Sequence, residues 1–236
     1  MCDFTLRLKT IYEFINAPER IESIEHMQQL IADANCLTLI EKSFFQDVEA
    51  IINEISTNNI AGDIVFVGVF KGGAALYLKA LFEHYGCKRK VWLFDSFKGF
   101  NREQITHEED IKALELFGTD DYFKQLATVQ SVTKLFTAFD LIENTEIVPG
   151  FIEETIPKQL IETVACLHID VDCYEPTLFA LENLHEKITP GGWCICDDYF
   201  VPLFDCKKAI DDFRSFNNIT SSIKKIGKYP AGWRVN

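Results

Sequence analysis

The 236-residue sequence lacks the long apolar run of a membrane-spanning helix, and it lacks the basic-then-apolar start of a signal peptide. Its eight cysteines include no CxxC pair, and no group of cysteines and histidines has the spacing of zinc ligands. Several cysteines lie inside apolar runs that are typical of buried strands. We therefore expect a cytoplasmic protein with reduced thiols, no zinc site and no membrane partner.

Positive charge is also scarce. The chain has 23 Lys and Arg residues against 36 Asp and Glu residues, which gives a net charge of −13. An acidic body of this kind repels nucleic acid and anionic membranes, so neither is expected as a partner. Hydrophobic residues make up 47% of the chain, which is enough for a large core.

The secondary-structure signals change at about residue 60. Residues 1–60 have the apolar spacing of helices, whereas short apolar runs alternate with helical stretches from Gly62 onward. The predicted strands are DIVFVGV (63–69), KVWLFD (90–95), TEIVPG (145–150), VACLHIDVD (164–172), GWCICDD (192–198), SSIKKIG (221–227) and GWRV (232–235). The helical stretches between them are residues 72–86, 121–139, 153–162, 176–188 and 206–216.

This alternation predicts an α/β protein whose mostly parallel sheet is covered by helices on both faces. The last two strands flank a turn at Pro230, so we expect an antiparallel pair at the sheet edge. We predict an N-terminal helical extension, 1–60, and one compact domain, 61–236. The acidic segment 98–125 is either a lid over the site or a simple insertion.

A glycine-rich turn follows the first strand, from Gly68 to Gly73. Glycines there allow a ligand to approach the backbone, and the next helix points its N–H groups at that ligand. The second strand ends at Asp95, where a carboxylate can accept the hydroxyls of a ribose. A tight turn would also explain the glycines, and a helix cap would also explain Asp95. Taken together, however, the glycine-rich turn and Asp95 favour a nucleoside-containing cofactor.

Acidic residues follow two later strands: Asp170 and Asp172 after one, Asp197 and Asp198 after the other. If those strands are neighbours, their ends lie about 5 Å apart, and three of the carboxylates can converge. Such a cluster is repulsive unless a hard divalent cation such as Mg²⁺ binds it. Helix caps or exposed loop charges are the alternative interpretation.

The motifs resemble one known family. GDIVFVGVFKGGAAL, VWLFDSFKGF, IVPGFIEETIP, HIDVDCYEPTLFALENLHEKITPGGWCICDDYF, CKKAIDDFR and the final GWR are similar to those of the macrocin O-methyltransferases. The resemblance covers about residues 36–235. It implies a Rossmann-like S-adenosylmethionine-methyltransferase fold with a seven-stranded sheet. It also implies Mg²⁺-dependent methylation of a hydroxyl on a sugar or a glycosylated small metabolite.

The resemblance also implies roles for individual residues. Those implied for the cofactor site are Gly68, Val69, Gly72 and Gly73 in the loop, Asp95 on the ribose, and Ser96, Gly150 and Phe151 near the adenosine. Asp170, Asp197 and Asp198 match the metal positions, and Asp170 also matches the catalytic base.

One position departs from the family pattern. The family has an acid two residues before the first loop glycine, and here that position is Phe66. Either another group replaces the acid, with Glu41 and Asp170 as the candidates, or the protein binds the cofactor weakly. A catalytically degenerate binding protein is an alternative. Methylation of a catechol-like phenol is a further alternative. A metal-dependent nucleotide hydrolase is disfavoured, because no phosphate-binding lysine loop follows the first strand.

Two other features carry weaker predictions. Phe4, Leu6, Leu8, Ile11 and Phe14 could pack against a partner subunit and so form a homo-oligomer. His168 lies within the fourth predicted strand, so we expect it in or near the core. His185 lies in a predicted helix, and we expect it to be exposed.

Overall fold

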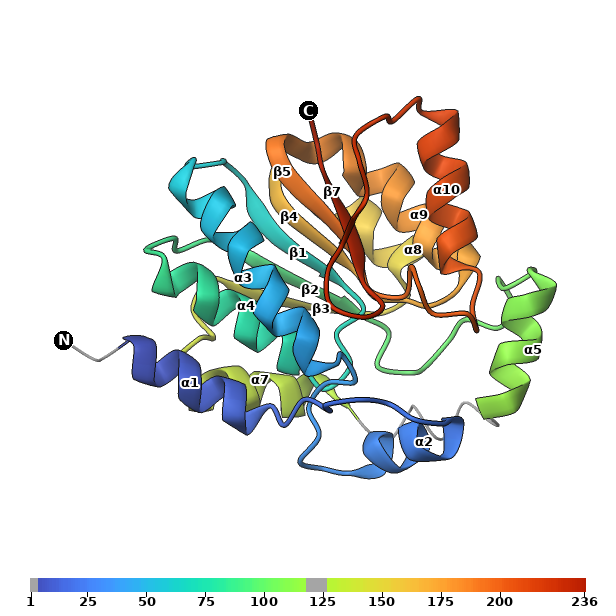
Figure 1. Cartoon of the computed structure of the whole chain (residues 1–236), viewed down its shortest axis with the longest axis horizontal. Helices are drawn as coiled ribbons and strands as arrows, with labels where there is room; N and C mark the ends of the chain where they lie inside the picture. Colours follow the sequence, from blue (N-terminus) through green and yellow to red (C-terminus); the bar gives the residue numbers. More distant parts are fainter. Residues whose placement is uncertain (1–3, 118–126) are drawn as a thin grey trace.

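The computed structural model describes residues 4–117 and 127–236, and seven strands form one sheet in the order β3-β2-β1-β4-β5-β7-β6 (Figure 1). The strands are β1 (Asp63–Val67), β2 (Val91–Asp95), β3 (Thr145–Pro149), β4 (Val164–Ile169), β5 (Ile188–Cys196), β6 (Lys224–Lys225) and β7 (Ala231–Arg234). The first five run parallel, and β7 pairs antiparallel with both β5 and β6. The predicted α/β class, the seven-stranded sheet and its antiparallel edge are confirmed.

Helices cover both faces of the sheet (Figure 1). The helices are α1 (Phe4–Phe14), α2 (Ile24–Ala32), α3 (Lys42–Thr57), α4 (Gly73–His84), α5 (Glu108–Phe117), α7 (Val129–Ala138), α8 (Ile152–Thr155), α9 (Tyr174–Leu184) and α10 (Cys206–Phe216). One core packs α1, α3, α4 and α7 on one face, and the other packs α8, α9 and α10 on the opposite face. Strands β1, β2, β4 and β5 are almost wholly buried, as their continuous apolar runs predict, whereas the edge strands β3 and β6 are partly or fully exposed.

The N-terminal helices share the core of the sheet. Phe44, Val48 and Ile52 of α3 are fully buried in the same cluster as β1 and β4. Ile11 of α1 is also fully buried there, so the prediction that it faces a partner subunit is wrong. Phe14 of α1 keeps about half of its surface exposed. In the ranges 4–117 and 127–236, no helix combines the length and the apolar character needed to cross a membrane.

Two predicted elements are shorter than expected. The helix predicted at 153–162 is one α-turn, α8, followed by a 3-10 turn at Ile156–Lys158. Pro157 has no N–H to continue a helix, which explains the early end. In the predicted helix 121–139, α7 begins after the Thr128 cap, and residues 118–126 lie outside the described residues.

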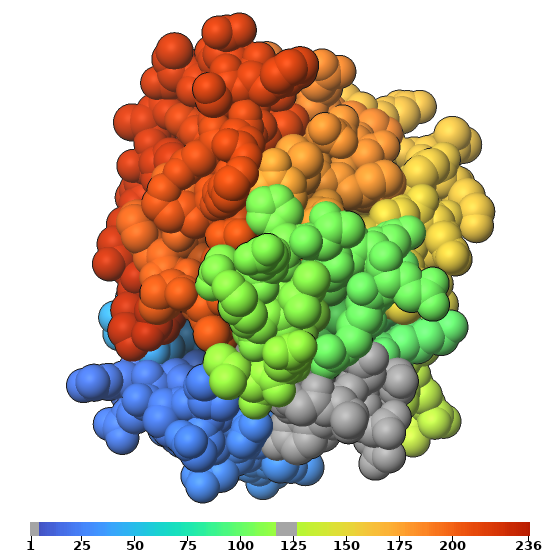
Figure 2. Space-filling view, turned by 90° about the vertical axis from the view of Figure 1, so that its right-hand side faces the viewer, coloured from blue at the N-terminus to red at the C-terminus, as the bar shows by residue number. Residues whose placement is uncertain are grey.

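Two segments lie over the carboxyl ends of the parallel strands. Figure 2 views this side, where the 98–117 segment (green) adjoins the chain before α10 (red) and α2 lies below (blue). Besides the two cores on the faces of the sheet, a smaller apolar cluster connects these segments. In this cluster Ile105, Leu114 and Phe204 are buried, and Met27 of α2 packs against it. Apolar side chains of this cluster therefore cover the carboxyl ends of the strands and form an apolar roof.

The turn after β1 leaves no room for a side chain. A Cβ at Gly68 would lie 1.8 Å from the Asp170 carbonyl oxygen, and φ there is +87°. We expect Gly68→Ala to lower the free energy of unfolding by about 2–5 kcal/mol, through backbone strain and overpacking together. Urea denaturation measures this loss.

Gly86→Ala is the matched control. Gly86 has φ +77°, but a Cβ there would meet no atom within 4 Å. It should cost only the left-handed backbone strain, about 1–2 kcal/mol. Equal losses in the two variants would contradict the close approach of β1 and β4 at Gly68.

Candidate active site

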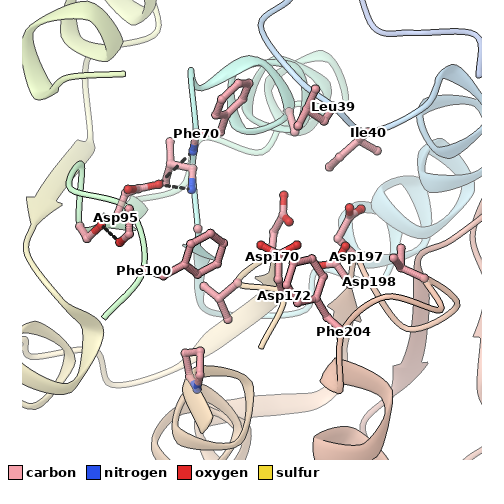
Figure 3. A pocket seen from close by; sticks show the side chains of 18 of the residues that line it. Leu39, Ile40, Phe70, Asp95, Phe100, Asp170, Asp172, Asp197, Asp198 and Phe204 are labelled. Atoms are coloured by element: carbon pink, nitrogen blue, oxygen red, sulfur yellow. Dashed lines mark hydrogen bonds between the residues drawn. The ribbon is translucent and has the colours of Figure 1, made fainter. Parts of the chain in front are cut away.

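A cavity of about 560 Å³ lies at the carboxyl ends of the strands, a size typical of small-molecule sites. Its wall contains residues that follow β1, β2, β4 and β5, together with parts of the segments 21–40, 97–105 and 201–204. Figure 3 shows Asp95 on one side of the cavity and the aspartates that follow β4 and β5 on the other. The cavity therefore joins the two sets of residues that the sequence motifs predicted.

Asp95 organises the glycine-rich loop. Its Oδ2 accepts hydrogen bonds from the backbone N–H groups of Val69 (2.8 Å) and Phe70 (2.9 Å), and its Oδ1 accepts one from Phe97 (2.8 Å) (Figure 3). Loss of hydration raises the pKa of Asp95, and these three donors oppose the rise. A carboxylate has about four acceptor positions, so capacity for one more donor remains. The sequence did not reveal this bracing role.

The predicted cofactor residues fall into two groups. Gly68, Val69, Asp95, Ser96 and Phe151 line the cavity. Gly72, Gly73 and Gly150 are not part of its wall. The N–H of Gly73 donates to the Leu37 carbonyl at 3.0 Å, and a Cβ at Gly73 would lie 2.5 Å from that oxygen. The second and third loop glycines thus serve the packing of α4 rather than the cavity surface.

The acidic residues converge as the sequence predicted. β4 and β5 are neighbours, and the N–H of Asp197 donates to the Ile169 carbonyl at 2.9 Å, which continues the ladder between the strands. One carboxylate oxygen each of Asp170, Asp197 and Asp198 lies within 4.8 Å of the other two. Asp172 lines the same cavity but does not belong to this trio.

The trio is electrostatically unfavourable by itself. Loss of hydration, followed by repulsion from neighbouring carboxylates, raises the pKa values of Asp170 and Asp197 well above the usual range. Burial raises the pKa of Asp198 to about 6. Oδ1 of Asp197 and Oδ2 of Asp198 are buried and have no hydrogen-bond partner in the described part of the chain. A pocket with three converging oxygens and unsatisfied acceptors suits a hard cation such as Mg²⁺.

The described part of the 98–125 segment forms a wall of the cavity. Its anchor is Asp110, which is fully buried and accepts the N–H groups of Tyr174 and Asp205, both at 2.7 Å. Glu175 accepts the N–H groups of Thr106 (2.9 Å) and His107 (3.1 Å). These bonds tie the segment to the starts of α9 and α10, which directly follow the two acidic loops.

Apolar residues from the N-terminal part complete the cavity. Ile24, Met27 and Ile31 of α2, with Leu39 and Ile40 beyond it, lie in the wall. The sequence motifs did not assign them to the site. Their helical spacing at positions 24, 27 and 31 was the available signal, because it marks an apolar face whose partner the sequence does not show.

The polar side chains around Phe66 differ in whether they already have hydrogen-bond partners. Phe66 is 1% exposed, and its ring lies 5.4 Å from that of His168. Glu41 accepts the Ile21 N–H (2.9 Å) and the Lys228 ammonium (3.0 Å), so it is already paired. His168 is buried, as expected, and burial lowers its pKa to about 4.

His185 differs from its prediction. It is half-buried, and its Nε2 accepts the indole N–H of Trp233 at 3.1 Å. Its ring also contacts Phe213 edge-on, with centroids 5.2 Å apart. The expected exposure was wrong because α10 and β7 pack over the end of α9. His185 is thus a structural residue, remote from the cavity.

Comparison with solved structures defines the class of the fold. The O-methyltransferase NovP superposes with a TM-score of 0.82 at 25% identity, covering 99% of this chain and 100% of that chain. The calicheamicin methyltransferase CalS11 superposes with a TM-score of 0.64 at 21% identity, covering 98% and 91%. The fold is that of the Rossmann-like methyltransferases.

Sequence comparison gives the family. The model described as Macrocin-O-methyltransferase (TylF) matches residues 16–235. Demethyldecarbamoylnovobiocin O-methyltransferase of Streptomyces niveus is 29% identical over 203 residues, which cover 85% of this chain and 76% of that protein. Mycinamicin III 3''-O-methyltransferase of Micromonospora griseorubida is 28% identical over 204 residues, covering 84% and 78%. The chain belongs to the macrocin O-methyltransferase family, a family of enzymes.

The aspartate trio should make stability depend on pH. The pKa of Asp198 is about 6 in the folded chain and near 4 in the unfolded chain. Between these two pH values, the folded chain therefore holds more protons than the unfolded chain. Stability without metal should therefore fall as pH rises from about 4 to above 6. At pH 7.5 in EDTA, we expect the free energy of unfolding of Asp197→Asn to exceed that of the wild type by about 1–2 kcal/mol, measured by urea denaturation.

The exposed Glu182 provides the matched control, since Glu182→Gln removes one carboxylate far from the cavity. Its free energy of unfolding should stay within about 0.5 kcal/mol of the wild type at pH 5 and pH 7.5. If Asp197→Asn were destabilised at pH 7.5 in EDTA, repulsion within the trio would be refuted.

Proposed function

We propose that the protein transfers a methyl group from S-adenosylmethionine to a hydroxyl of a sugar-containing small molecule, with Mg²⁺ held by Asp170, Asp197 and Asp198. One observation carries the proposal: the trio of carboxylates shares a cavity with the loop that Asp95 braces. The family membership supports methyl transfer, and the trio supports a hydroxyl acceptor held by a metal.

The cofactor would lie over β1 and β2. Bound S-adenosylmethionine supplies an electrophilic methyl group on a sulfonium. The remaining acceptor position of Asp95 suits a ribose hydroxyl, and Gly68 and Val69 present backbone beside it. Ser96 and Phe151 line the cavity at the ends of β2 and β3, where the adenosine would pack. The carboxylates of the wall also favour a cationic sulfonium.

The acceptor hydroxyl would lie beside the trio. Bound Mg²⁺ lowers the pKa of a coordinated hydroxyl and holds it in place. Asp170 is the residue that takes the proton, because its carboxylate follows β4 next to the loop of β1. The apolar roof excludes water and positions the reactants, an effect that can supply about 7–11 kcal/mol in bimolecular reactions.

The charge of the wall favours an acceptor without phosphate. Its carboxylates belong to Glu22, Asp95, Glu153, Asp170, Asp172, Asp197 and Asp198. Among the described lining residues there is no Lys or Arg. One relative's name specifies a rhamnosyl-tetracenomycin substrate, and two others are named for demethyldecarbamoylnovobiocin and mycinamicin III. An uncharged sugar on a small metabolite fits both observations.

A binding protein without turnover is the second candidate. Phe66 motivates it, because a buried ring stands where the family has an acid. This candidate predicts absent or very weak binding of S-adenosylhomocysteine, aspartates not loaded with metal, and no methyl transfer to any glycoside. The convergence of the trio favours the enzyme instead, since a protein without turnover would gain nothing from three repelling carboxylates.

Activity should depend on the metal and on the base. With S-adenosylmethionine and a panel of rhamnosides, we expect product in Mg²⁺ and none in EDTA, measured by mass spectrometry. Asp170→Asn should lower kcat by about 100- to 10,000-fold. Its affinity for S-adenosylhomocysteine should change less than threefold, whereas Glu182→Gln should behave as wild type. Full wild-type turnover in EDTA would contradict the metal assignment.

The acceptor preference is measurable separately. For one sugar, we expect kcat/KM for the neutral glycoside to exceed that for the nucleoside diphosphate sugar by at least about tenfold, which corresponds to about 1.4 kcal/mol of repulsion. Raising the salt concentration should narrow the difference, because screening weakens charge repulsion. A preference for the nucleoside diphosphate sugar would show that the negative wall does not select the acceptor.

A further inference from the structure

His168 is a polar side chain in the cavity wall that has no protein partner. His168 is 1% exposed, and neither its Nδ1 nor its Nε2 has a hydrogen-bond partner among the described residues. A buried polar group left unsatisfied costs about 1–3 kcal/mol, so such groups in native proteins normally have a partner. The partner of this imidazole should therefore be something that enters the cavity.

The side chains packed around His168 offer its ring nitrogens no hydrogen-bond partner. Phe44 and Phe66 flank the ring at centroid distances of 5.7 and 5.4 Å. On the neighbouring strands, its register partners are Phe66 of β1 and Ile195 of β5. Neither flanking side chain can donate or accept a conventional hydrogen bond. Both ring nitrogens are themselves buried, so a ligand that packs against His168 in the cavity is the partner left to them.

The position in the sheet indicates which part of a ligand would lie there. Phe66 and His168 are paired, and each precedes by two residues the point where Gly68 meets Asp170. Asp95 lies on β2, two strands from β4 in the order β2-β1-β4. Neighbouring strands are about 4.8 Å apart, so Asp95 and His168 are separated by about 10 Å across the sheet, and Asp95 lies two residues, about 7 Å, further along the strands. A nucleoside held at Asp95 would thus place its extended substituent near His168.

The charge of the wall indicates the chemistry of that substituent. The described lining residues offer no Lys or Arg to a ligand carboxylate, so a neutral donor has to serve. A neutral imidazole has one N–H donor and one acceptor nitrogen. It can therefore bond an α-carboxylate or an α-ammonium, the two groups of an amino-acid head.

We propose that His168 binds the amino-acid head of the S-adenosylmethionine cofactor and supplies the polar contact that the adjacent Phe66 does not. This inference rests on the proposed function, because it assumes that cofactor. His168 is then a cofactor-binding residue in the middle of the sheet, between the ribose site and the aspartate trio. A hydrogen bond there would be strengthened by its apolar surroundings.

Two ligands isolate this contact. S-adenosylhomocysteine carries the amino-acid head, and 5'-methylthioadenosine has the same nucleoside and a thioether without it. We would measure both dissociation constants by calorimetry in EDTA. His168→Phe should weaken S-adenosylhomocysteine binding by about tenfold, equal to about 1.4 kcal/mol, and leave methylthioadenosine within twofold. His168→Gln, which keeps a donor and an acceptor, should recover part of the loss.

The controls separate a contact from general packing. Phe44→Leu removes the ring on the other side of His168, and it should not change the ratio of the two dissociation constants. Ligand-free melting confirms that each variant is folded. An unchanged affinity of His168→Phe, or an equal loss for both ligands, would overturn the inference alone. A wild type that binds neither ligand would overturn the proposed function as well.

Discussion

The parallel pairing of β1, β4 and β5 is the constraint on which the site depends. Parallel strands end at the same edge, so residues far apart in the sequence become neighbours there. The pairing brings Asp170 beside Asp197, and it brings Gly68 so close to Asp170 that a side chain at Gly68 would collide with its carbonyl. The acidic trio and the glycine-rich loop are therefore two consequences of one register.

The same register creates an electrostatic cost. Three carboxylates with raised pKa values lie in one cavity, and two of their buried oxygens have no hydrogen-bond partner within residues 4–117 and 127–236. A domain is stable by only about 5–15 kcal/mol, so the sheet has to offset this repulsion. Two large apolar cores, one on each face, provide that support. Strain of this kind at a site is typical of a structure shaped for a charged ligand.

Around the trio, hydrogen bonds hold the loops after β1 and β2 in place, and apolar residues form much of the remaining wall. Asp95 braces the loop after β1, and Asp110 fastens the chain after β2 to the starts of α9 and α10. Much of the remaining wall is apolar and comes from α2 and from the segments near Phe100 and Phe204.

Much of this molecule was predictable from its sequence. The alternation of apolar runs determined the α/β class, and DVD and DDY at strand ends predicted converging carboxylates, because local patterns report burial and periodicity. The roles of Asp110, α2 and His168 depended on the tertiary structure. So did the true extent of the helix at Pro157 and the burial of His185. Each depends on contacts between residues distant in the chain, and only the packed fold decides which side chains find partners and which remain unsatisfied beside a cavity.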